Sequence, residues 1–331
     1  MRMLNTIESI FSNYKGILAT DESTGTIQKR FNSVGMESTV QSRHDYRHML
    51  FSTPGISPFI GGVILFDETI KSPATIEPLR AQNIQLGIKV DKGAKDYGNA
   101  TLTEGLDGLS ERLDEYRDLG ATFAKWRSVI RPRGYRSEHL SSESNLQINS
   151  MVMAVYAKRC QDHEIVPIVE PEVLMDGSHG VGISYDATSN AIKELFRALH
   201  SQGVDLEKII LKPNMVVTGY SSHVRASTEE VAEKTVSCFM NNVPAIVPAI
   251  AFLSGGQEDE EVLNNLRHIN QNFHMPWGVS FSFGRTLQRG ALHCWSEGRH
   301  DCAQKWLAKR ARECSECVGM RTEATAWDSG R

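Results

Sequence analysis

Short apolar segments rich in β-branched residues recur along the chain, and longer amphipathic segments separate most of them. In the longer segments apolar residues stand three and four positions apart, which is typical of helices. Residues 106–120 are the clearest case, because their apolar side chains form one stripe and Gly120 stands where a helix would end. The short segments predict eight strands, at 15–20, 61–66, 87–90, 123–130, 166–170, 209–212, 245–253 and 278–283. Further helices are predicted near 143–163, 186–202, 227–242, 257–270 and 286–312.

Strands that alternate with helices predict a parallel sheet, and eight such units favour a closed (β/α)8 barrel, the TIM-barrel fold, with outer helices. A doubly wound open sheet is the alternative. It would usually carry a glycine-rich phosphate turn after its first strand, but that strand here ends in ATDESTG. We expect residues 1–312 to form one barrel domain. The polar residues 313–331 are expected to form a flexible C-terminal tail.

Composition is that of a soluble globular protein, with 40% hydrophobic and 23% charged residues. The net charge of -4 argues against a nucleic-acid partner, which usually selects a basic face. The N-terminus lacks a signal-peptide pattern, and the longest apolar stretch, AIVPAIAFL, is too short to span a bilayer. We therefore expect a cytoplasmic location and no membrane contact.

The six cysteines show no framework-like spacing. Only Cys314 and Cys317 form a CxxC pair, and no second pair accompanies it. Free thiols in a helical segment are therefore favoured over a metal site there.

Six of the eight predicted strands contain ionisable residues or are followed by them. In a barrel the active site is built at the C-terminal ends of the strands, so these charges should converge on one mouth. The alternative is that strand ends simply emerge into solvent, which explains a single charge better than a whole rim. The residues are Asp21, Lys89, Asp91, Lys125, Arg127, Glu170, Glu172, Lys212 and Arg285.

Two loops at the same mouth predict anion sites. LSGGQ follows strand seven and SFGRTL follows strand eight, where such barrels often bind phosphate through glycine backbone N–H groups and an arginine. A plain turn is the alternative for the two glycines. The segment DESTGTIQKR, with Lys89 nearby, suggests a second anion site, although a serine- and threonine-rich loop is often only a helix cap. Two such sites suggest a small bisphosphorylated substrate.

Lys212 ends the buried strand IILK and is followed by Pro213. Burial and neighbouring cations make a lysine amine easier to deprotonate, and a neutral amine can attack a ketone to form a Schiff base. Glu170 could then shuttle protons, and Asp21 could accept a hydroxyl proton as a C–C bond breaks. This chemistry requires no metal and no cofactor. The alternative is a lysine paired structurally with Glu170 or Glu172.

The segments GILATDESTGTIQKR, GGVILFDET, GIKVDKG, GLDGLSER, FAKWR, IVPIVEPEVL, IILKPNMV, FLSGGQ and SFSFGR resemble class I fructose-bisphosphate aldolase, in order, over most of the chain. The resemblance implies reversible cleavage of fructose 1,6-bisphosphate to two triose phosphates, dihydroxyacetone phosphate and glyceraldehyde 3-phosphate. It also implies a cytoplasmic homotetramer.

The resemblance assigns roles to the charged rim. Lys212 is the implied Schiff-base lysine, Glu170 and Lys125 its acid–base and electrostatic partners with Glu172 close by, and Asp21 handles the C4 hydroxyl. The implied substrate-binding residues are Ser254, Gly255, Gly284 and Arg285 at the C1 phosphate, and Ser23, Thr26, Arg30, Lys89 and Arg127 toward the C6 phosphate. Gly256 and Ser282 are further substrate-binding residues that are assigned to neither phosphate.

Two departures from the family pattern bear on function. The segment after the second strand, KSPATIEPLRAQNIQL, is shorter than the vertebrate pattern and differs from it. Tyr220 is the last tyrosine, so the C-terminal tail cannot supply the tyrosine with which animal-type members end. Thr26 also stands where serine is common, but this change from one hydroxyl to another is expected to be mild. Two alternatives therefore remain beside the aldolase. One is a binding protein that has lost catalysis. The other is a Schiff-base aldolase for another sugar phosphate, such as fructose 1-phosphate or sedoheptulose 1,7-bisphosphate.

Overall fold

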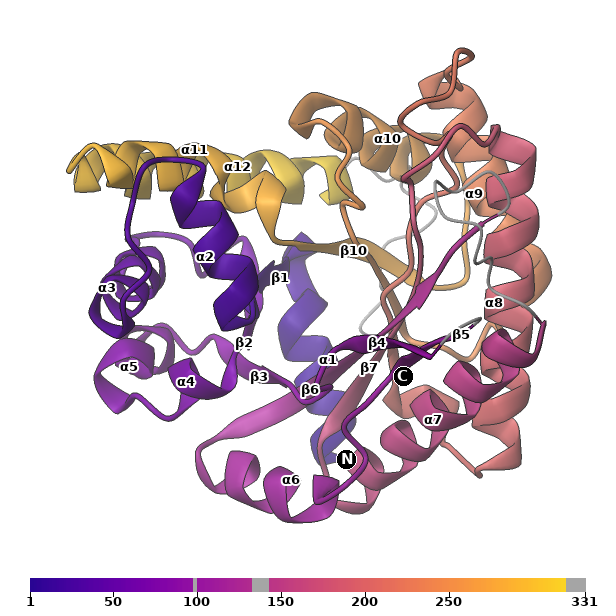
Figure 1. Cartoon of the computed structure of the whole chain (residues 1–331), viewed down its shortest axis with the longest axis horizontal. Helices are drawn as coiled ribbons and strands as arrows, with labels where there is room; N and C mark the ends of the chain where they lie inside the picture. The colour runs from indigo at the N-terminus through magenta and orange to yellow at the C-terminus, as the bar shows by residue number, and fades with distance from the viewer. Residues whose placement is uncertain (98–99, 133–142, 320–331) are drawn as a thin grey trace.

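The computed structural model describes residues 1–97, 100–132 and 143–319, and eight strands in it close into a parallel barrel (Figure 1). The strand order around the ring is β1-β10-β9-β8-β7-β6-β3-β2. The predicted barrel is therefore confirmed, and the open sheet is not. The barrel strands are β1 Gly16–Ala19, β2 Ile60–Leu65, β3 Gln85–Lys89, β6 Ala121–Ile130, β7 Val166–Val173, β8 Ile210–Leu211, β9 Ala249–Phe252 and β10 Gly278–Phe283.

Helices surround the barrel, and their ends follow local signals. Helix α6 stops just before Gly120, whose φ of 94° is open to glycine, and Ser227 caps α9 by accepting the Glu230 N–H. The helices are α1 Arg2–Phe11, α2 Thr24–Asn32, α3 Val40–Phe51, α4 Asp67–Ile70, α5 Pro73–Ala81, α6 Leu109–Asp118, α7 Glu143–Asp162, α8 Val181–Ser201, α9 Thr228–Asn242, α10 Asp259–Asn272, α11 Arg285–Ser296 and α12 His300–Gly319.

The N-terminal helix α1 closes the end of the barrel at which the strands begin, here called the lower end, and contacts β1, β2, β3, β6 and β7 (Figure 1). The strand–helix pattern did not predict this feature. Ile7 and Ile10 are buried among the apolar side chains of the barrel interior. A Cβ on Gly61 of β2 would lie 2.1 Å from the carbonyl oxygen of Ile10, so only glycine allows the helix to approach this closely.

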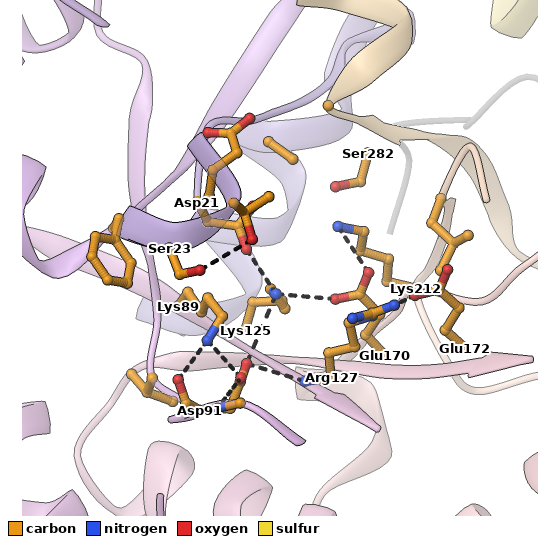
Figure 2. Close-up of a pocket in the computed structure, with 18 of the residues that line it drawn as sticks. Asp21, Ser23, Lys89, Asp91, Lys125, Arg127, Glu170, Glu172, Lys212 and Ser282 are labelled. Carbon is orange, nitrogen blue, oxygen red and sulfur yellow. Dashed lines mark hydrogen bonds and ion pairs between the residues drawn. The ribbon is translucent and has the colours of Figure 1, made fainter. Parts of the chain in front are cut away.

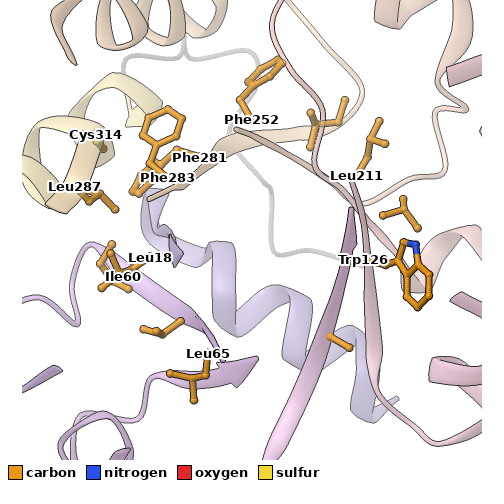
Figure 3. Packing of buried hydrophobic residues seen from close by; sticks show 14 of the residues in the cluster. Leu18, Ile60, Leu65, Trp126, Leu211, Phe252, Phe281, Phe283, Leu287 and Cys314 are labelled. Carbon is orange, nitrogen blue, oxygen red and sulfur yellow. The ribbon is translucent and has the colours of Figure 1, made fainter. Parts of the chain in front are cut away.

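Side chains alternate between the barrel interior and its outer face, as strand geometry requires. The outward residues, among them Leu18, Trp126, Leu211 and Phe252, pack into one large core beneath the helices (Figure 3). The inward residues start as an apolar layer near α1, which includes Phe123 and β8 residue Ile210. Toward the C-terminal ends of the strands this inward set becomes charged.

Most strands differ from their predicted bounds, and the last strands before the SGG turn, β8 and β9, are markedly shorter. Strand β9 begins only at Ala249, four residues later than predicted, because Pro248 has no backbone N–H for the ladder. Strand β8 is limited to two residues, although the N–H of Lys212 still donates to the carbonyl of Val169 at 2.8 Å. The ladder therefore fixes the backbone of Lys212 against β7.

The C-terminal region differs from its prediction in two ways. The helix predicted at 286–312 is divided into α11 and α12, separated by a turn in which Gly298 has a φ of 73°. The tail boundary at 313 is wrong for residues 313–319, because α12 continues to Gly319 and buries Cys314 and Cys317. The rest of the predicted tail, 320–331, lies outside the described residues.

The cysteines contain one pairing that their spacing did not indicate. A disulfide joins Cys294 of α11 to Cys302 of α12. In the described part of the chain, no cluster of three or more histidine, cysteine or acidic side chains could hold a metal ion. No described helix is long and apolar enough to cross a membrane.

A small antiparallel hairpin, β4 Ala94–Tyr97 with β5 Ala100–Thr103, interrupts the pattern after β3. The buried amide of Asn149 holds it, accepting from the Thr103 N–H at 3.2 Å and donating to the Thr101 carbonyl at 2.8 Å. The Thr103 hydroxyl in turn donates to the carbonyl of Arg127 at 2.8 Å. The hairpin is thereby fixed to the C-terminal end of β6.

Candidate active site

A cavity of about 1060 Å³ opens at the C-terminal ends of the barrel strands. Fifteen of the sixteen site residues expected from the sequence line it, and Gly256 does not. The fifteen are Asp21, Ser23, Thr26, Arg30, Lys89, Lys125, Arg127, Glu170, Glu172, Lys212, Ser254, Gly255, Ser282, Gly284 and Arg285.

Lys212 is buried at the end of β8, with only 4% of its surface exposed. Strands β7 and β8 are paired with Ile168 opposite Ile210, and two residues further along each strand this register places Glu170 beside Lys212. The Nζ of Lys212 lies 3.2 Å from Oε1 of Glu170 (Figure 2). The structural pairing considered from the sequence is therefore present, and it places an acid–base group at the amine.

Lys125 lies between three carboxylates at the centre of the cavity floor (Figure 2). Its Nζ is 2.7 Å from Asp21, 3.3 Å from Glu170 and 3.8 Å from Asp91. Burial lowers the pKa of Lys125, but the carboxylates, led by Asp21, outweigh burial and hold it above its ordinary value. Lys125 is therefore a fixed positive charge at neutral pH.

For the carboxyl of Asp21, burial and neighbouring charges shift the pKa in the opposite directions to those for Lys125. Burial raises its pKa, but the ammonium groups of Lys125 and Lys212 outweigh burial and hold the pKa well below the ordinary value. Asp21 is therefore ionised at neutral pH. The contacts join Asp21, Lys125, Glu170 and Lys212 into one continuous chain of alternating charge (Figure 2).

Two further ion pairs flank this chain. The Nε of Arg127 contacts a carboxylate oxygen of Glu172. Among the described residues, Arg127 is the ion-pair partner of Glu172. Lys89 lies 2.6 Å from both a carboxylate oxygen and the carbonyl of Asp91. Lys89 and Arg127, two of the three cations expected at the C6-phosphate end, thus have carboxylate partners in this structure.

The opposite end of the cavity carries a cation without such a partner. Within the described residues, Arg285 has no carboxylate at ion-pair distance, and it starts helix α11 next to Gly284. Ser254 and Gly255 line the cavity on the same side. The buried hydroxyl of Ser282 has no hydrogen-bond partner among the described residues and faces the space near Lys212 (Figure 2). An unpaired guanidinium with hydroxyls and a helix N-terminus suits a phosphate group.

The hydroxyls of Ser23 and Thr26 lie 3.1 Å apart at the start of α2. Arg30, grouped with them in the sequence-based expectation, contacts Glu22, and its Nη2 lies 3.7 Å from the place that a Cβ on Gly284 would take. The structure thus places the Arg30 guanidinium beside the Gly284 loop, whereas the expectation assigned it to the C6-phosphate end.

Comparisons with known proteins agree over nearly the whole chain. A family model described as fructose-bisphosphate aldolase class-I matches residues 2–328. The chain is 46% identical over 323 residues to a probable fructose-bisphosphate aldolase class 1 of Xanthomonas axonopodis pv. citri, covering 94% of this chain and 96% of the other. It is 42% identical over 315 residues to fructose-bisphosphate aldolase 4, cytosolic, of Arabidopsis thaliana, covering 92% and 79%. The chain belongs to the class I fructose-bisphosphate aldolase family.

A solved aldolase structure has the same fold. The fructose-bisphosphate aldolase of Plasmodium falciparum, in complex with TRAP and a small-molecule inhibitor, superposes with a TM-score of 0.93 at 38% identity. The match covers 97% of this chain and 95% of that chain. The barrel therefore has the fold of a solved aldolase over nearly its whole length.

Sequence reasoning named Asp91 on the charged rim without giving it a role, and it left out Glu22 and Gln288. Asp91 connects Lys89 to Lys125, and its position two residues after Lys89 in VDK was the available signal. Glu22 is buried and accepts from Gln288 at 3.0 Å, and Gln288 also donates to the carbonyl of Ala19 at 2.8 Å. Gln288 lies 266 positions from Glu22, so no local pattern could have joined them.

Proposed function

We propose that this aldolase family member cleaves fructose 1,6-bisphosphate reversibly to dihydroxyacetone phosphate and glyceraldehyde 3-phosphate through a Schiff base at Lys212. The observation that carries the proposal is the buried contact of 3.2 Å between the Lys212 amine and Glu170. A buried amine beside a carboxylate, inside a cavity of about 1060 Å³, suits imine formation with a sugar ketone.

The first step is attack of the Lys212 nitrogen on the C2 ketone. The lysine nitrogen gives up two protons in turn, one before and one after the attack, and Glu170 passes each of them to the C2 oxygen, which leaves as water. The product is a positively charged iminium. Lys125, already a fixed positive charge at neutral pH, stands 3.3 Å from the Glu170 carboxyl.

The second step breaks the bond between C3 and C4. The bonding electrons move into the iminium to form an enamine, and the C4 hydroxyl loses its proton as glyceraldehyde 3-phosphate forms. Asp21 is ionised and faces the cavity, so it is the acceptor for this proton. Its contact of 2.7 Å with Lys125 fixes the direction of the carboxylate.

The third step protonates the enamine at C3, and water then hydrolyses the imine to release dihydroxyacetone phosphate. We infer that Glu170, whose Oε1 lies 3.2 Å from the Nζ of Lys212, supplies this proton as well. The phosphate at C1 is assigned to Ser254, Gly255, Gly284 and Arg285, and the C6 end to Ser23, Thr26, Lys89 and Arg127.

Borohydride reduction tests the Schiff base directly. Borohydride added with fructose 1,6-bisphosphate should inactivate the enzyme irreversibly and leave a sugar-phosphate adduct on Lys212, detectable by peptide mass spectrometry. Borohydride alone, and Lys212→Met treated with substrate, are the matched controls and should carry no adduct. Activity that survives this treatment but is abolished by EDTA would contradict the proposal.

The assembly state and cellular location are proposals as well. We propose a cytoplasmic homo-oligomer, a tetramer by resemblance to the family, and the Arabidopsis relative named cytosolic supports the location. Analytical ultracentrifugation of the full chain and cell fractionation test these two points separately.

A further inference from the structure

Three loops at the mouth of the barrel meet at Tyr220, a residue that the proposed chemistry does not use. The loops follow β7, β8 and β9, which are neighbours in the ring. The backbone N–H of Tyr220, in the second loop, donates to the carbonyl of Met175 in the first loop at 2.8 Å. The Tyr220 hydroxyl donates to the carbonyl of Gly255 in the third loop at 2.9 Å. Tyr220 therefore anchors the SGG turn to the rest of the mouth.

The SGG turn has a backbone that depends on glycine. Gly255 and Gly256 have φ values of 59° and 88°, in the left-handed region that glycine adopts without strain. Consecutive N–H groups in turns of this kind can converge on an anion. A Cβ on Gly255 would also lie 2.8 Å from the Sδ of Met175, so the neighbouring loop packs closely behind the turn.

The tyrosine hydroxyl and the free guanidinium lie against the same glycine. A Cβ on Gly256 would be 2.1 Å from the hydroxyl oxygen of Tyr220 and 2.5 Å from the Nη2 of Arg285. Burial raises the pKa of Tyr220 to about 12, although the Arg285 guanidinium opposes that rise. The hydroxyl thus keeps its proton at neutral pH and remains a donor to Gly255.

The hydrogen bond to Gly255 also sets the direction of the next N–H. The peptide between Gly255 and Gly256 is trans, so its C=O and N–H point in opposite directions. With the C=O held by Tyr220, the N–H of Gly256 points away from Tyr220. Gly255 lines the cavity whereas Tyr220 lies outside the lining, so this direction is the cavity side of the turn. A peptide between two glycines could otherwise flip easily.

We propose that Tyr220 is a positioning residue for the phosphate bound by Ser254, Gly255 and Arg285, and that its hydroxyl keeps the Gly256 N–H directed at that phosphate. The proposal rests on the proposed function, which assigns a substrate phosphate to this end. Because Tyr220 lies outside the cavity lining, its loss should weaken binding and leave the chemistry at Lys212 unchanged.

Tyr220→Phe tests this by removing one hydroxyl while keeping the ring. The KM for fructose 1,6-bisphosphate and for fructose 1-phosphate should rise by the same factor, about fivefold, with kcat within about twofold, since one ordinary hydrogen bond is lost. Inorganic phosphate, as a competitive inhibitor and in calorimetric titration, should bind more weakly by a similar factor. Tyr97→Phe, which removes a surface hydroxyl that contacts Glu104, is the matched control and should behave as wild type.

Several outcomes would overturn the proposal. They are an unchanged KM with unchanged phosphate binding, a fall in kcat at constant KM, or the same change in Tyr97→Phe. Arg285→Ala is the control that shows where phosphate binds, because it removes the guanidinium assigned to this site. Phosphate binding that survives Arg285→Ala occurs elsewhere on the protein and would also contradict the proposal. If wild type does not cleave either substrate, the proposed function fails, while phosphate titration of wild type and Tyr220→Phe still decides the role of Tyr220.

Discussion

The barrel interior is apolar in its N-terminal half and charged in its C-terminal half, although the same strands build both. Phe123 on β6 and Ile210 on β8 lie in the lower apolar layer against α1. Two residues further along the same strands, Lys125 and Lys212 lie among carboxylates in the cavity. On each of these strands, a residue that packs in the apolar layer and a residue of the charged site are only two positions apart.

This comparison shows where the precision of the site originates. Residues i and i+2 of a strand face the same side, so the register fixed by the apolar layer is transmitted to the charged layer above it. The lower layer should therefore govern stability and the upper layer reactivity. Substitutions in the two layers should separate these properties, and the following predictions are ordered by the size of the expected effect.

The largest effect should come from removing the amine in the upper half. Lys212→Met should lower kcat by roughly four orders of magnitude or more, as expected for an essential nucleophile. Its stability should stay close to that of wild type, because Glu170 keeps its contact of 3.3 Å with Lys125. Steady-state cleavage assays and denaturant unfolding measure the two properties.

Lys212→Arg is the matched control for this first prediction, because it keeps the positive charge beside Glu170 and cannot form an imine. It should be as inactive as Lys212→Met. An active Lys212→Arg would mean that the lysine serves only as an ionic partner of Glu170, and the division between the two halves would lose its main support.

The second effect lies in the lower half. The ring of Phe123 is 2.1 Å from the place of a Cβ on Gly87 and 3.1 Å from that on Gly62, so it fills the space that these glycines leave. Phe123→Ala should destabilise the protein by about 3–5 kcal/mol through the cavity it creates, with kcat changed by no more than a few-fold. Urea unfolding and kcat measured well below the unfolding temperature test this pair of results. A stable but inactive Phe123→Ala would refute the assignment of packing to the lower half.

The sequence allowed the barrel and much of its mouth to be predicted, because both depend on local pattern. Apolar runs located the eight strands, and a charged residue at the end of a run located Lys125, Glu170 and Lys212. The position of α1 could not be predicted, because its buried face of Ile7 and Ile10 indicates a helix without indicating the surface it covers. The hairpin β4–β5 was missed because its short strands show no continuous apolar pattern.

The second feature that the sequence could not predict is which charged side chains in the cavity pair with each other. The i, i+2 spacing placed Arg127 and Glu172 on the cavity side of their strands, but it could not show that they pair with each other. It likewise could not place the Arg30 guanidinium beside Gly284, because a long side chain on α2 can reach either end of the cavity. Partners of this kind are decided by the three-dimensional arrangement of loops that lie far apart in the sequence.

The third prediction compares the two ends of the upper half. Arg285→Ala should raise the KM for fructose 1,6-bisphosphate by roughly 10- to 100-fold, because a charge-assisted phosphate contact is lost and no carboxylate is left unpaired. Arg127→Ala should raise KM and also reduce stability, because Glu172 loses its partner. Kinetics and unfolding of both variants separate the two cases. Equal stability losses in both would contradict the distinction between the free and the paired arginine.

The smallest effect concerns pH and sharpens the electrostatic side of the comparison. The folded protein holds the pKa of Asp21 below its ordinary value of 3.8 and that of Lys125 above its ordinary value of 10.5. The stability contributed by Asp21 is full above the unfolded pKa and is lost as pH falls through the folded pKa. The contribution of Lys125 is full below the unfolded pKa and is lost as pH rises through the folded pKa. The pair should therefore leave the free energy of unfolding independent of pH between about pH 5 and pH 9, and lower it on both sides.

Asp21→Asn should remove the part of the stability loss at acid pH that Asp21 causes. It should also reduce the stability loss at alkaline pH, because Lys125 then lacks its nearest carboxylate. Asp118→Asn, at an aspartate whose side chain is 78% exposed, is the matched control and should leave the profile as in wild type. Urea unfolding across the pH range gives these slopes. If Asp21→Asn and wild type lose stability equally between about pH 4 and pH 2, Lys125 does not hold Asp21 ionised. The upper half would then lack the charge separation that the proposed C–C cleavage requires.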